Sequence, residues 1–569
     1  MPPQSIKAHG FIDRSRSGKA ATFGFTSSTL STMRQLWKFP IYQCAGFAML
    51  ILLGIFFRFF NLDRYPYWGD EFFSLLRLSG YTQRELIDNV FTGTLMQIWD
   101  LNVYQSVHNG RTWLDTVQSL AIEDAQHPPL YYVLLRFWSE RFGDSIAAIR
   151  SFSSLLSLLA LPTIYWLSLE LFALPLAAWF AVALVCVSPL HVLNAQEVRE
   201  YGLWTVTILL SSLLLLRAMR RPQRQTWIAY AFSCTIGLYT FPMTVFVMVS
   251  HALYLGKMEA FQPSKTVKAF LIAIGGAAIA FLPWAIVIWQ SRQQIIATNL
   301  WSSYPMTLIE RWGNYGFNLA LSFVAIPHAF SKLPQAEIAI ELWLTIPPVV
   351  LATIWISAYA LYFLMLKAPP AARWFLLSLM GVTFVALFLP DVLTGSRRST
   401  AYRYLMPCYL GLHLAIADLM AVKLSATNRR SHLWRGLIFG LLLSAVVTGM
   451  VHTQVEGGLN YYREPEHPQI AQIIHAAPHP LLIGSINRSL NRLPGADGSL
   501  GVLFTLLHRL EPSTWVQLVV EPQVPILPEG YQYFLYNPSE YLLNSLRQQY
   551  DASRLQASLQ GELWQLKPR

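Results

Sequence analysis

The sequence predicts a mainly α-helical membrane protein: a polytopic bundle of about 11–13 spans with a small C-terminal α/β domain on the non-cytoplasmic side. Hydrophobic residues make up 54% of the 569 residues, charged residues only 13%, and the mean hydropathy is +0.38. Soluble domains carry about 25% charged residues, so this chain cannot cover its own surface in water. Apolar runs of about 20 residues recur along the chain, and each is long enough to cross a bilayer.

The N-terminal segment, residues 1–40, is polar and basic. A basic flank before the first apolar run places this segment in the cytoplasm. No small-residue cleavage site follows that run, so an uncleaved anchor is expected rather than a signal peptide.

The transmembrane domain is expected over residues 41–454. A long outer loop, residues 61–144, follows the first span, and two apolar stretches, 127–142 and 312–330, could dip into the membrane or add to the count. The eleven main spans, each of about 20 apolar residues, are expected near 41–60, 147–171, 174–193, 203–218, 227–239, 243–255, 267–289, 340–366, 374–389, 404–421 and 433–451.

The cationic residues cluster in short loops beside these spans, as in the group from Arg217 to Arg224. Cytoplasmic loops carry such an excess of Lys and Arg, so the net charge of +11 reflects orientation rather than nucleic-acid binding. Alternation then places the loops 61–144, 194–201, 290–337 and 390–403 on the outer side, together with the C-terminal end. We expect an integral plasma (inner) membrane protein with a cytoplasmic N-terminus.

Residues 455–569 have the composition of a soluble extracytoplasmic α/β domain. Four short β-rich runs (481–484, 515–520, 531–535 and 562–566) alternate with helical stretches at 469–475, 499–510 and 538–549. No motif in this domain indicates its function.

A pair of carboxylates, Asp70 and Glu71, follows the first span inside an aromatic-rich stretch. Carboxylates near a membrane boundary are poorly solvated, and such a group can serve as a general base. The alternative is an ordinary helix start, where Asp and Glu favour the first turn.

His127 opens a second polar group, His-Pro-Pro-Leu-Tyr-Tyr, which includes Tyr131. The two prolines can open a helix, and the amphipathic stretch that follows is short for a span. His127 is therefore either a capping residue beside an interfacial helix or part of a site.

The third group, Gln-Glu-Val-Arg-Glu-Tyr at 196–201, stands at the outer mouth of a span. Gln196 and Arg199 are three residues apart and are expected to share a helix face. Ionisable groups at this depth face a cavity or a partner; the alternative is that Arg199 only forms an ion pair between helices.

The fourth group is an outer loop, 396–404, with three arginines that include Arg398 and Arg403. Arginines on the outer side run against the usual charge bias. Their guanidinium groups match phosphate oxygens, which indicates an anionic ligand; contact with lipid headgroups is the alternative.

Together the four groups describe one site at the outer leaflet with a carboxylate base and phosphate-binding cations. A sugar attached to a lipid phosphate already carries a good leaving group. Arginine can hold the departing phosphate, so the enzyme needs only a base on the acceptor hydroxyl, whereas retaining glycosidases need a nucleophile and an acid/base.

These motifs resemble those of the membrane-embedded glycosyltransferases of the C superfamily, most closely the family-39-like branch of protein O-mannosyltransferases and aminoarabinose lipid A transferases. The resemblance is carried by the Asp70-Glu71 pair, by His127-Pro-Pro-Leu-Tyr-Tyr with Phe142-Gly-Asp-Ser and Arg150, by Ser188-Pro-Leu-His and the 196–201 group, and by Arg403-Tyr404. It covers residues 41–260 well and the rest loosely.

The resemblance implies transfer with inversion from a polyprenyl-phosphate-linked sugar. It implies Asp70 as catalytic base with Glu71 assisting. Arg199, Arg403 and Arg398 become candidates for the donor phosphate. The substrate-binding candidates are His127, Tyr131, Gln196, Glu197 and Tyr201.

The resemblance also implies no obligate metal, although neighbouring carboxylates could hold Mg²⁺. The expected partners are the lipid-linked donor, membrane lipids and an acceptor that is a glycolipid, a polysaccharide or a protein; no nucleic acid is expected. The main alternative is a transporter or flippase of lipid-linked sugars, which would not need the Asp70 base. A third is a non-catalytic anchor for the C-terminal domain.

Overall fold

The computed structural model describes residues 40–64, 68–325, 340–425, 431–454, 466–487, 499–557 and 562–569. Residues 1–45 form a compact unit separate from residues 46–569. Of the first unit only residues 40–45 are described, so the predicted N-terminal segment lies almost wholly outside the described residues. The following paragraphs concern the second unit.

The described part of the chain contains eight helical segments that are long and apolar enough to cross a membrane. The prediction of an integral membrane helix bundle is confirmed. The segments are α2 (Ile41–Phe59), α7 (Ile146–Leu158) with α8 (Ala160–Phe172), α11 (Tyr201–Arg220), α14 (Lys265–Gln290), α17 (Ile340–Lys367), α18 (Pro370–Thr394), η5 (Tyr402–Leu405) with α19 (Met406–Ser425), and α20 (Ser431–Gln454).

Three further predicted spans are present as bent or shorter helices. α9 (Pro175–Val187) and α10 (Pro189–Ala195) meet at an angle of 56° and give a ninth span if they are counted as one. α12 (Arg224–Thr240) and α13 (Thr244–Met258) have 17 and 15 residues. Among the described residues, eight helical segments, or nine if the bent pair is one span, have the length and composition of a span. α12 and α13 lie below that length, so the expected 11–13 spans are not all found as full-length helices in this part of the chain.

The stretches 127–142 and 312–330 do not provide additional spans within the described residues. They contain α6 (Leu130–Phe142) and α16 (Leu308–Ala320), each 13 residues long. A 13-residue helix is only about 20 Å long, which is shorter than the roughly 30 Å hydrocarbon core. Residues 326–330 lie outside the described residues.

The bend between α9 and α10 is stabilised by a buried arginine of α2. Pro189 cannot donate a backbone hydrogen bond, so the last carbonyls of α9 lose their helical partners. Arg58 donates to the carbonyl oxygens of Val185 and Cys186, and a cation is favourable at a helix C-terminus. The bend directs α10 toward the turn at residues 196–200.

Residues 61–144 after α2, which we call the outer loop after their predicted side of the membrane, contain several short elements in their described part. They are α3 (Gly69–Leu78), α4 (Gln83–Val90), β1 (Thr92–Gln97), η1 (Ile98–Tyr104) and α5 (Trp113–Glu123). Arg77 and Glu123 form a buried ion pair of 2.7 Å between the ends of α3 and α5. Arg136 of α6 donates to the carbonyl oxygen of Leu78 at 2.7 Å, which satisfies a backbone acceptor at the end of α3.

The C-terminal region forms a six-stranded sheet in the order β1-β3-β2-β4-β6-β5. Its central strands β2 (Pro480–Asn487), β3 (Trp515–Glu521) and β4 (Gln532–Tyr536) are parallel, and β5 (Tyr550–Ala557) and β6 (Glu562–Pro568) are antiparallel additions. Three helices accompany the sheet: α21 (His467–His475), α22 (Ser499–Leu507) and α23 (Glu540–Leu546). All four predicted strands and three predicted helical stretches are found; β5 was not predicted.

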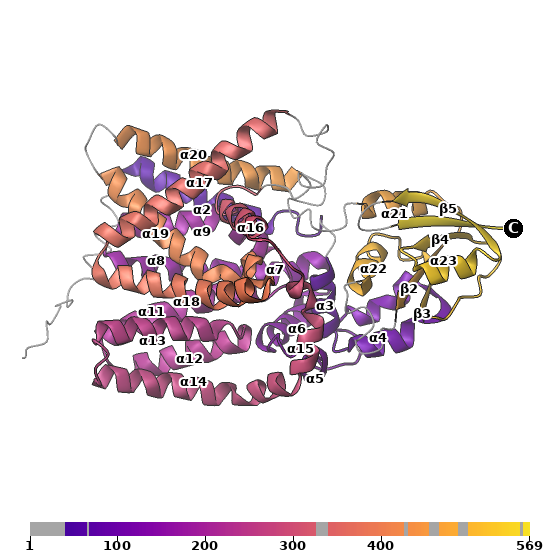
Figure 1. The fold of residues 1–569 in the computed structure, drawn as a ribbon, viewed down its shortest axis with the longest axis horizontal. Helices are drawn as coiled ribbons and strands as arrows, with labels where there is room; N and C mark the ends of the chain where they lie inside the picture. The colour runs from indigo at the N-terminus through magenta and orange to yellow at the C-terminus, as the bar shows by residue number, and fades with distance from the viewer. Residues whose placement is uncertain are drawn as a thin grey trace, which may run out of the picture. The chain divides into compact units, whose positions relative to one another are not determined.

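The sixth strand of this sheet comes from the outer loop. β1 pairs antiparallel with β3, with Leu95 opposite Gln517, so the loop and the C-terminal region build one sheet. The same two regions share a hydrophobic core, in which Phe72 of α3 stacks on Phe504 of α22. Figure 1 shows the outer-loop helices α3 and α4 beside α22 and the sheet. The domain limits at 61–144 and 455–569 stay predictions, but the two segments fold together.

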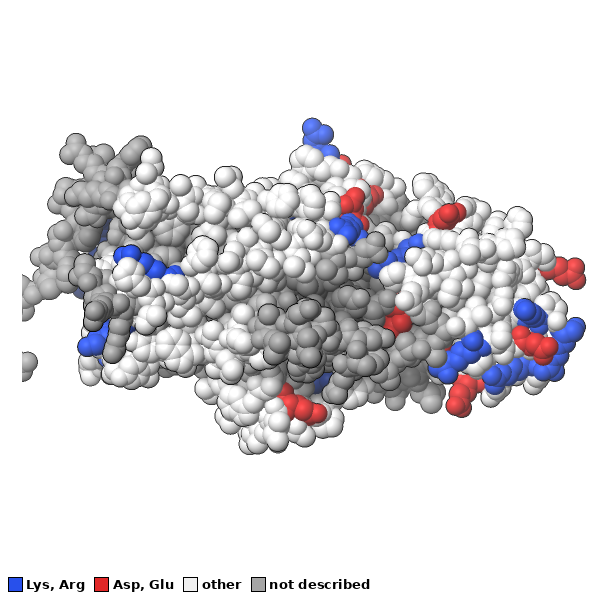
Figure 2. Space-filling model, turned by 90° about the horizontal axis from the view of Figure 1, so that it is seen from above, with Lys and Arg blue, Asp and Glu red and all other residues white. Residues whose placement is uncertain are grey.

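The surface agrees with a membrane location for the helical bundle. In Figure 2 most of the helical part is white, and red and blue atoms are most numerous at the end that carries the sheet. Large apolar side chains such as Leu271, Ile279 and Phe439 are exposed on the spans. Such a surface is suited to contact with lipid.

Candidate active site

Asp70 and Glu71 lie in the first turn of α3, which begins at Gly69. The Glu71 carboxylate folds back and accepts the backbone N–H of Trp68 at 3.3 Å, which satisfies one of the free donors at the helix start. The two carboxylates differ sharply in exposure: the Asp70 side chain is 31% exposed and that of Glu71 0%. Only Asp70 is therefore accessible to a substrate.

Glu71 is the centre of a buried connection. Arg150 of α7 donates to both of its oxygens, at 3.0 and 2.8 Å, and the backbone N–H of Val198 donates at 2.9 Å. The carboxylate thus links α3, α7 and the turn at 196–200. This position favours a structural role for Glu71 over direct assistance in catalysis.

Asp70 faces an arginine from the distant loop before α19. Arg403 Nη1 lies 3.1 Å from Asp70 Oδ2. The guanidinium carbon of Arg403 is 5.6–6.0 Å from the centres of four aromatic rings, those of Trp68, Tyr201, Trp301 and Tyr404. Cation–π contacts favour the charged form of arginine in such a setting. Its Nε is buried and has no hydrogen-bond partner among the described residues.

Arg199 also lies beside Asp70. Its Nη1 lies 3.3 Å from Ser74 Oγ and 3.4 Å from the carbonyl oxygen of Asp70, and its Cζ is 5.7 Å from the ring of Tyr201. Burial lowers the pKa of Arg199, but Glu200 and the other nearby acidic groups outweigh it and the pKa is raised. Two guanidinium groups therefore lie within 6 Å of the centre of the Tyr201 ring, next to Asp70.

The expectation that Gln196 and Arg199 share a helix face is wrong. α10 ends at Ala195 and α11 begins at Tyr201, so residues 196–200 form a turn. The break allows Arg199 to point toward Asp70 while Gln196 points toward α2 and α20, where it contacts the Phe57 carbonyl and His452.

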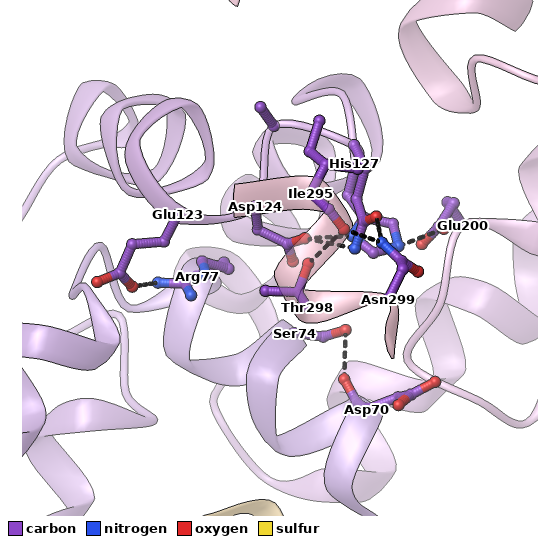
Figure 3. Close-up of polar contacts among 12 residues, drawn as sticks. Asp70, Ser74, Arg77, Glu123, Asp124, His127, Glu200, Ile295, Thr298 and Asn299 are labelled. Atoms are coloured by element: carbon purple, nitrogen blue, oxygen red, sulfur yellow. Dashed lines mark hydrogen bonds and ion pairs between the residues drawn. The ribbon is translucent and has the colours of Figure 1, made fainter. Parts of the chain in front are cut away.

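His127 connects Arg199 to a second acid. Its Nε2 lies 2.8 Å from Arg199 Nη2 and its Nδ1 lies 2.7 Å from Asp124 Oδ1. Because arginine can only donate, Nε2 must accept, and the ring proton on Nδ1 is then donated to Asp124. Figure 3 shows His127 between Asp124 and Glu200.

Two buried acids, Asp124 and Glu200, accompany Arg199 and His127 at this end of the site. Burial would raise the pKa of Asp124, but His127, Arg77 and Arg199 outweigh it and hold the pKa below its usual range. Glu200 is buried, accepts from the Tyr132 hydroxyl at 3.2 Å and lies 3.7 Å from Arg199 Nε. These acids fix Arg199 in place without covering its face toward Asp70.

Several predicted site residues lie outside this cluster. The hydroxyl of Tyr131 is buried against Ser153 Oγ at 2.6 Å, and Gln196 bridges α2 and α20. Glu197 is buried, and Arg398 is exposed with its Nη2 at 3.3 Å from Ser302 Oγ. The cluster itself contains Asp70, His127, Arg199, Tyr201 and Arg403 from the predicted set.

Several members of the cluster were not among the predicted site residues, including Asp124, Glu200 and Trp301. Asp124 stands three residues before His127, and Glu200 directly follows Arg199, so both were visible as acids next to chosen residues. Trp301 comes from the loop between α14 and α16 and carried no sequence signal. Within the described ranges no group of three or more His, Cys, Asp or Glu has a geometry that could hold a metal ion. The expectation about metal therefore stays a prediction.

Residues 126–289 match the family model described as dolichyl-phosphate-mannose-protein mannosyltransferase. The match confirms the resemblance found in the sequence. It includes His127, Arg199 and Tyr201 of the cluster and supports a membrane-embedded glycosyltransferase. No curated protein matches the chain.

Three solved structures are similar at low identity. ArnT from Cupriavidus metallidurans in the apo state has 13% identity and a TM-score of 0.47, over 92% of this chain and 98% of ArnT. ArnT bound to undecaprenyl phosphate has 14% identity and a TM-score of 0.46 over the same shares. The apo oligosaccharyltransferase of Archaeoglobus fulgidus has 12% identity and a TM-score of 0.46, over 84% of this chain and 65% of the other.

Proposed function

We propose that this protein transfers a sugar from a polyprenyl-phosphate donor to an acceptor at the outer face of the membrane, with inversion and with Asp70 as the base. The observation that carries the proposal is the convergence of Asp70, Arg199 and Arg403 from three distant segments around Tyr201. The family description, which names a lipid-phosphate-linked sugar, supports the donor class.

The arrangement suits a single displacement. The acceptor oxygen attacks the anomeric carbon from the face opposite the phosphate, and its proton passes to Asp70. The anomeric C–O bond breaks, and its electron pair leaves with the polyprenyl phosphate. Arg403 and Arg199 are placed to stabilise the charge on the departing phosphate, which removes the need for a general acid.

Arg403 has two anionic partners in this scheme. In the structure it pairs with Asp70 at 3.1 Å. A donor phosphate competes with Asp70 for the same guanidinium, because charge-assisted bonds to phosphate are at least as strong. Binding of the donor thus frees the Asp70 carboxylate to accept the proton of the acceptor.

In this proposal His127 orients Arg199, and Arg398 takes no direct part. Four buried side chains hold the surrounding elements in place without contacting the substrate: Glu71, Tyr131, Gln196 and Glu197. No metal is required, since two arginines supply the positive charge. The acceptor, a glycolipid, a polysaccharide or a protein, is not specified by the cluster. The same holds for the identity of the sugar.

The test compares lipid extracts by mass spectrometry from cells with the wild-type protein and cells with only Asp70→Asn. Asp63→Asn is the matched control, because Asp63 is an exposed carboxylate in the same loop. We expect a polyprenyl-phosphate sugar to accumulate in the Asp70→Asn cells alone, and its mass identifies the sugar class. Identical extracts at normal protein level would refute the role of Asp70 and favour a transporter of lipid-linked sugars.

A further inference from the structure

The C-terminal region contacts α3 at its first turn, next to Asp70. Gly501, in the first turn of α22, lies against Gly69, the residue before Asp70. A Cβ atom at Gly501 would stand 2.8 Å from Gly69 Cα and 3.4 Å from Phe73 Cε2. The first distance is too short for carbon atoms, and the obstacle is main chain that cannot rotate away. Glycine is needed here for the close approach of two backbones.

A second contact between α3 and α22 lies about one helical turn further along α22. The rings of Phe72 and Phe504 stack with centroids 4.4 Å apart and planes at 25°, and both side chains are buried. Aromatic pairs of this kind stabilise a contact beyond the effect of the area that they bury. The first turns of α3 and α22 are therefore held in one relative position.

The other end of the outer loop is also fixed to the C-terminal region. β1 pairs with β3, and the backbone N–H groups of Ile98 and Trp99 donate to the carbonyl oxygens of Thr514 and Pro512 at 3.1 and 3.0 Å. The Gln517 side chain donates to the Gly93 carbonyl at 2.8 Å. The segment from α3 to η1 is thus connected to the C-terminal region at its start and near its end.

We propose that the C-terminal region is a positioning part of the active site, with Gly501 as the residue that sets the start of α3 and hence the place of Asp70. The inference rests on the proposed function, because it gives the region a role in that reaction. Arg199 and Arg403 stand on other elements, so a shift of α3 changes the position of the base relative to the phosphate-binding groups.

Gly501→Ala tests this directly. Alanine forces α22 and α3 apart by roughly 0.7 Å, because carbon atoms pack at about 3.5–4.0 Å and not at 2.8 Å. Its better helix propensity opposes any loss of α22. Misplacement of a reacting group by about 1 Å can cost about 100-fold in rate, so we expect transfer to slow by about 10–100-fold. Gly313→Ala is the control, because Gly313 lies in a helix with no atom within 4 Å of an added Cβ.

Three measurements on the full-length protein separate positioning from general damage. Donor accumulation in cells reports transfer, binding of undecaprenyl phosphate to the purified protein reports the arginines, and hydrogen exchange reports α3 locally. For Gly501→Ala we expect donor accumulation, binding within about twofold of wild type, and faster exchange of the amides of α3 but not of α11. Gly313→Ala should match wild type in all three.

If Gly501→Ala does not fold, Phe504→Leu replaces it, because that change removes the stacking without a clash. Normal transfer by a folded variant of either kind, or equal loss of binding and transfer, would overturn the inference. Failure of the proposed function looks different: Asp70→Asn, measured beside these variants, would then not accumulate donor at all.

Discussion

Replacing Glu71 by Gln distinguishes a structural from a catalytic role for this residue. The change keeps the size of the side chain and removes the charge that Arg150 contacts with two nitrogens at 3.0 and 2.8 Å. The new NH₂ group would face a guanidinium, donor against donor. Arginine keeps its charge in proteins. Because Arg150 is 2% exposed, its charge would be buried without the carboxylate partner. Breaking a buried pair in this way costs about 3–5 kcal/mol.

The assay is thermal unfolding of the purified protein in detergent. A loss of this size lowers the Tm by roughly 2–4 °C, because the entropy of unfolding is about 2.1 cal/mol/K per residue and the chain has 569 residues. Asp551→Asn is the matched control, because Asp551 pairs with Arg569 at 3.0 Å and both side chains are exposed, at 73% and 57%. Surface pairs contribute at most about 1 kcal/mol, so its Tm should hardly change.

A double variant completes the test. Glu71→Gln with Arg150→Met removes both charges, and we expect it to recover a large part of the lost stability, since apolar replacements of buried pairs are well tolerated. The coupling between the two changes is read from the double-mutant cycle. The reasoning is refuted if Glu71→Gln keeps the wild-type Tm and yet stops transfer, because Glu71 would then act on the substrate.

Two further predictions concern the arginines. Arg403→Gln should weaken the binding of undecaprenyl phosphate about 10–100-fold, which corresponds to the loss of one or two charge-assisted hydrogen bonds. The control Arg398→Gln alters an exposed residue and should bind as wild type. Equal losses of binding in both variants would contradict the assignment of Arg403 to the phosphate. His127→Ala leaves Arg199 without the imidazole that it contacts at 2.8 Å and should weaken the same binding by about tenfold with little change in Tm. Unchanged binding in this variant would show that His127 does not orient Arg199.

The helices and strands that were predicted well are those that a pattern of neighbouring residues indicates. Long apolar runs gave the spans, and compact β-rich runs gave β2, β3, β4 and β6. β1 was missed because Thr92-Gly-Thr-Leu-Met-Gln97 is short, contains a glycine and follows a helix, so nothing nearby indicates a strand. Its pairing with β3 depends on residues far along the chain, which no local pattern can show.

The site residues, too, were predicted where a local sequence feature indicated them. Residue types and spacing indicated Asp70, His127, Arg199, Tyr201 and Arg403, and the structure brings all five together. The sequence could not separate them from neighbours with the same chemistry. Gln196 and Tyr131 have hydrogen-bonding groups too, but the break at residues 196–200 and the inward face of α6 direct these to the core.

Asp70 and Glu71 are adjacent on α3 but their side chains point in different directions and have different roles. Successive residues on an α-helix point about 100° apart. Once the Glu71 side chain turns toward Arg150 and Val198 in the interior, that of Asp70 must point to another side of α3, and this side faces Arg403. The buried acid fixes the rotation of the helix, and the exposed acid receives its direction from that rotation. A change in the direction of the Glu71 side chain would therefore displace Asp70 as well. Both acids thus contribute to the site, although only Asp70 is open to the substrate.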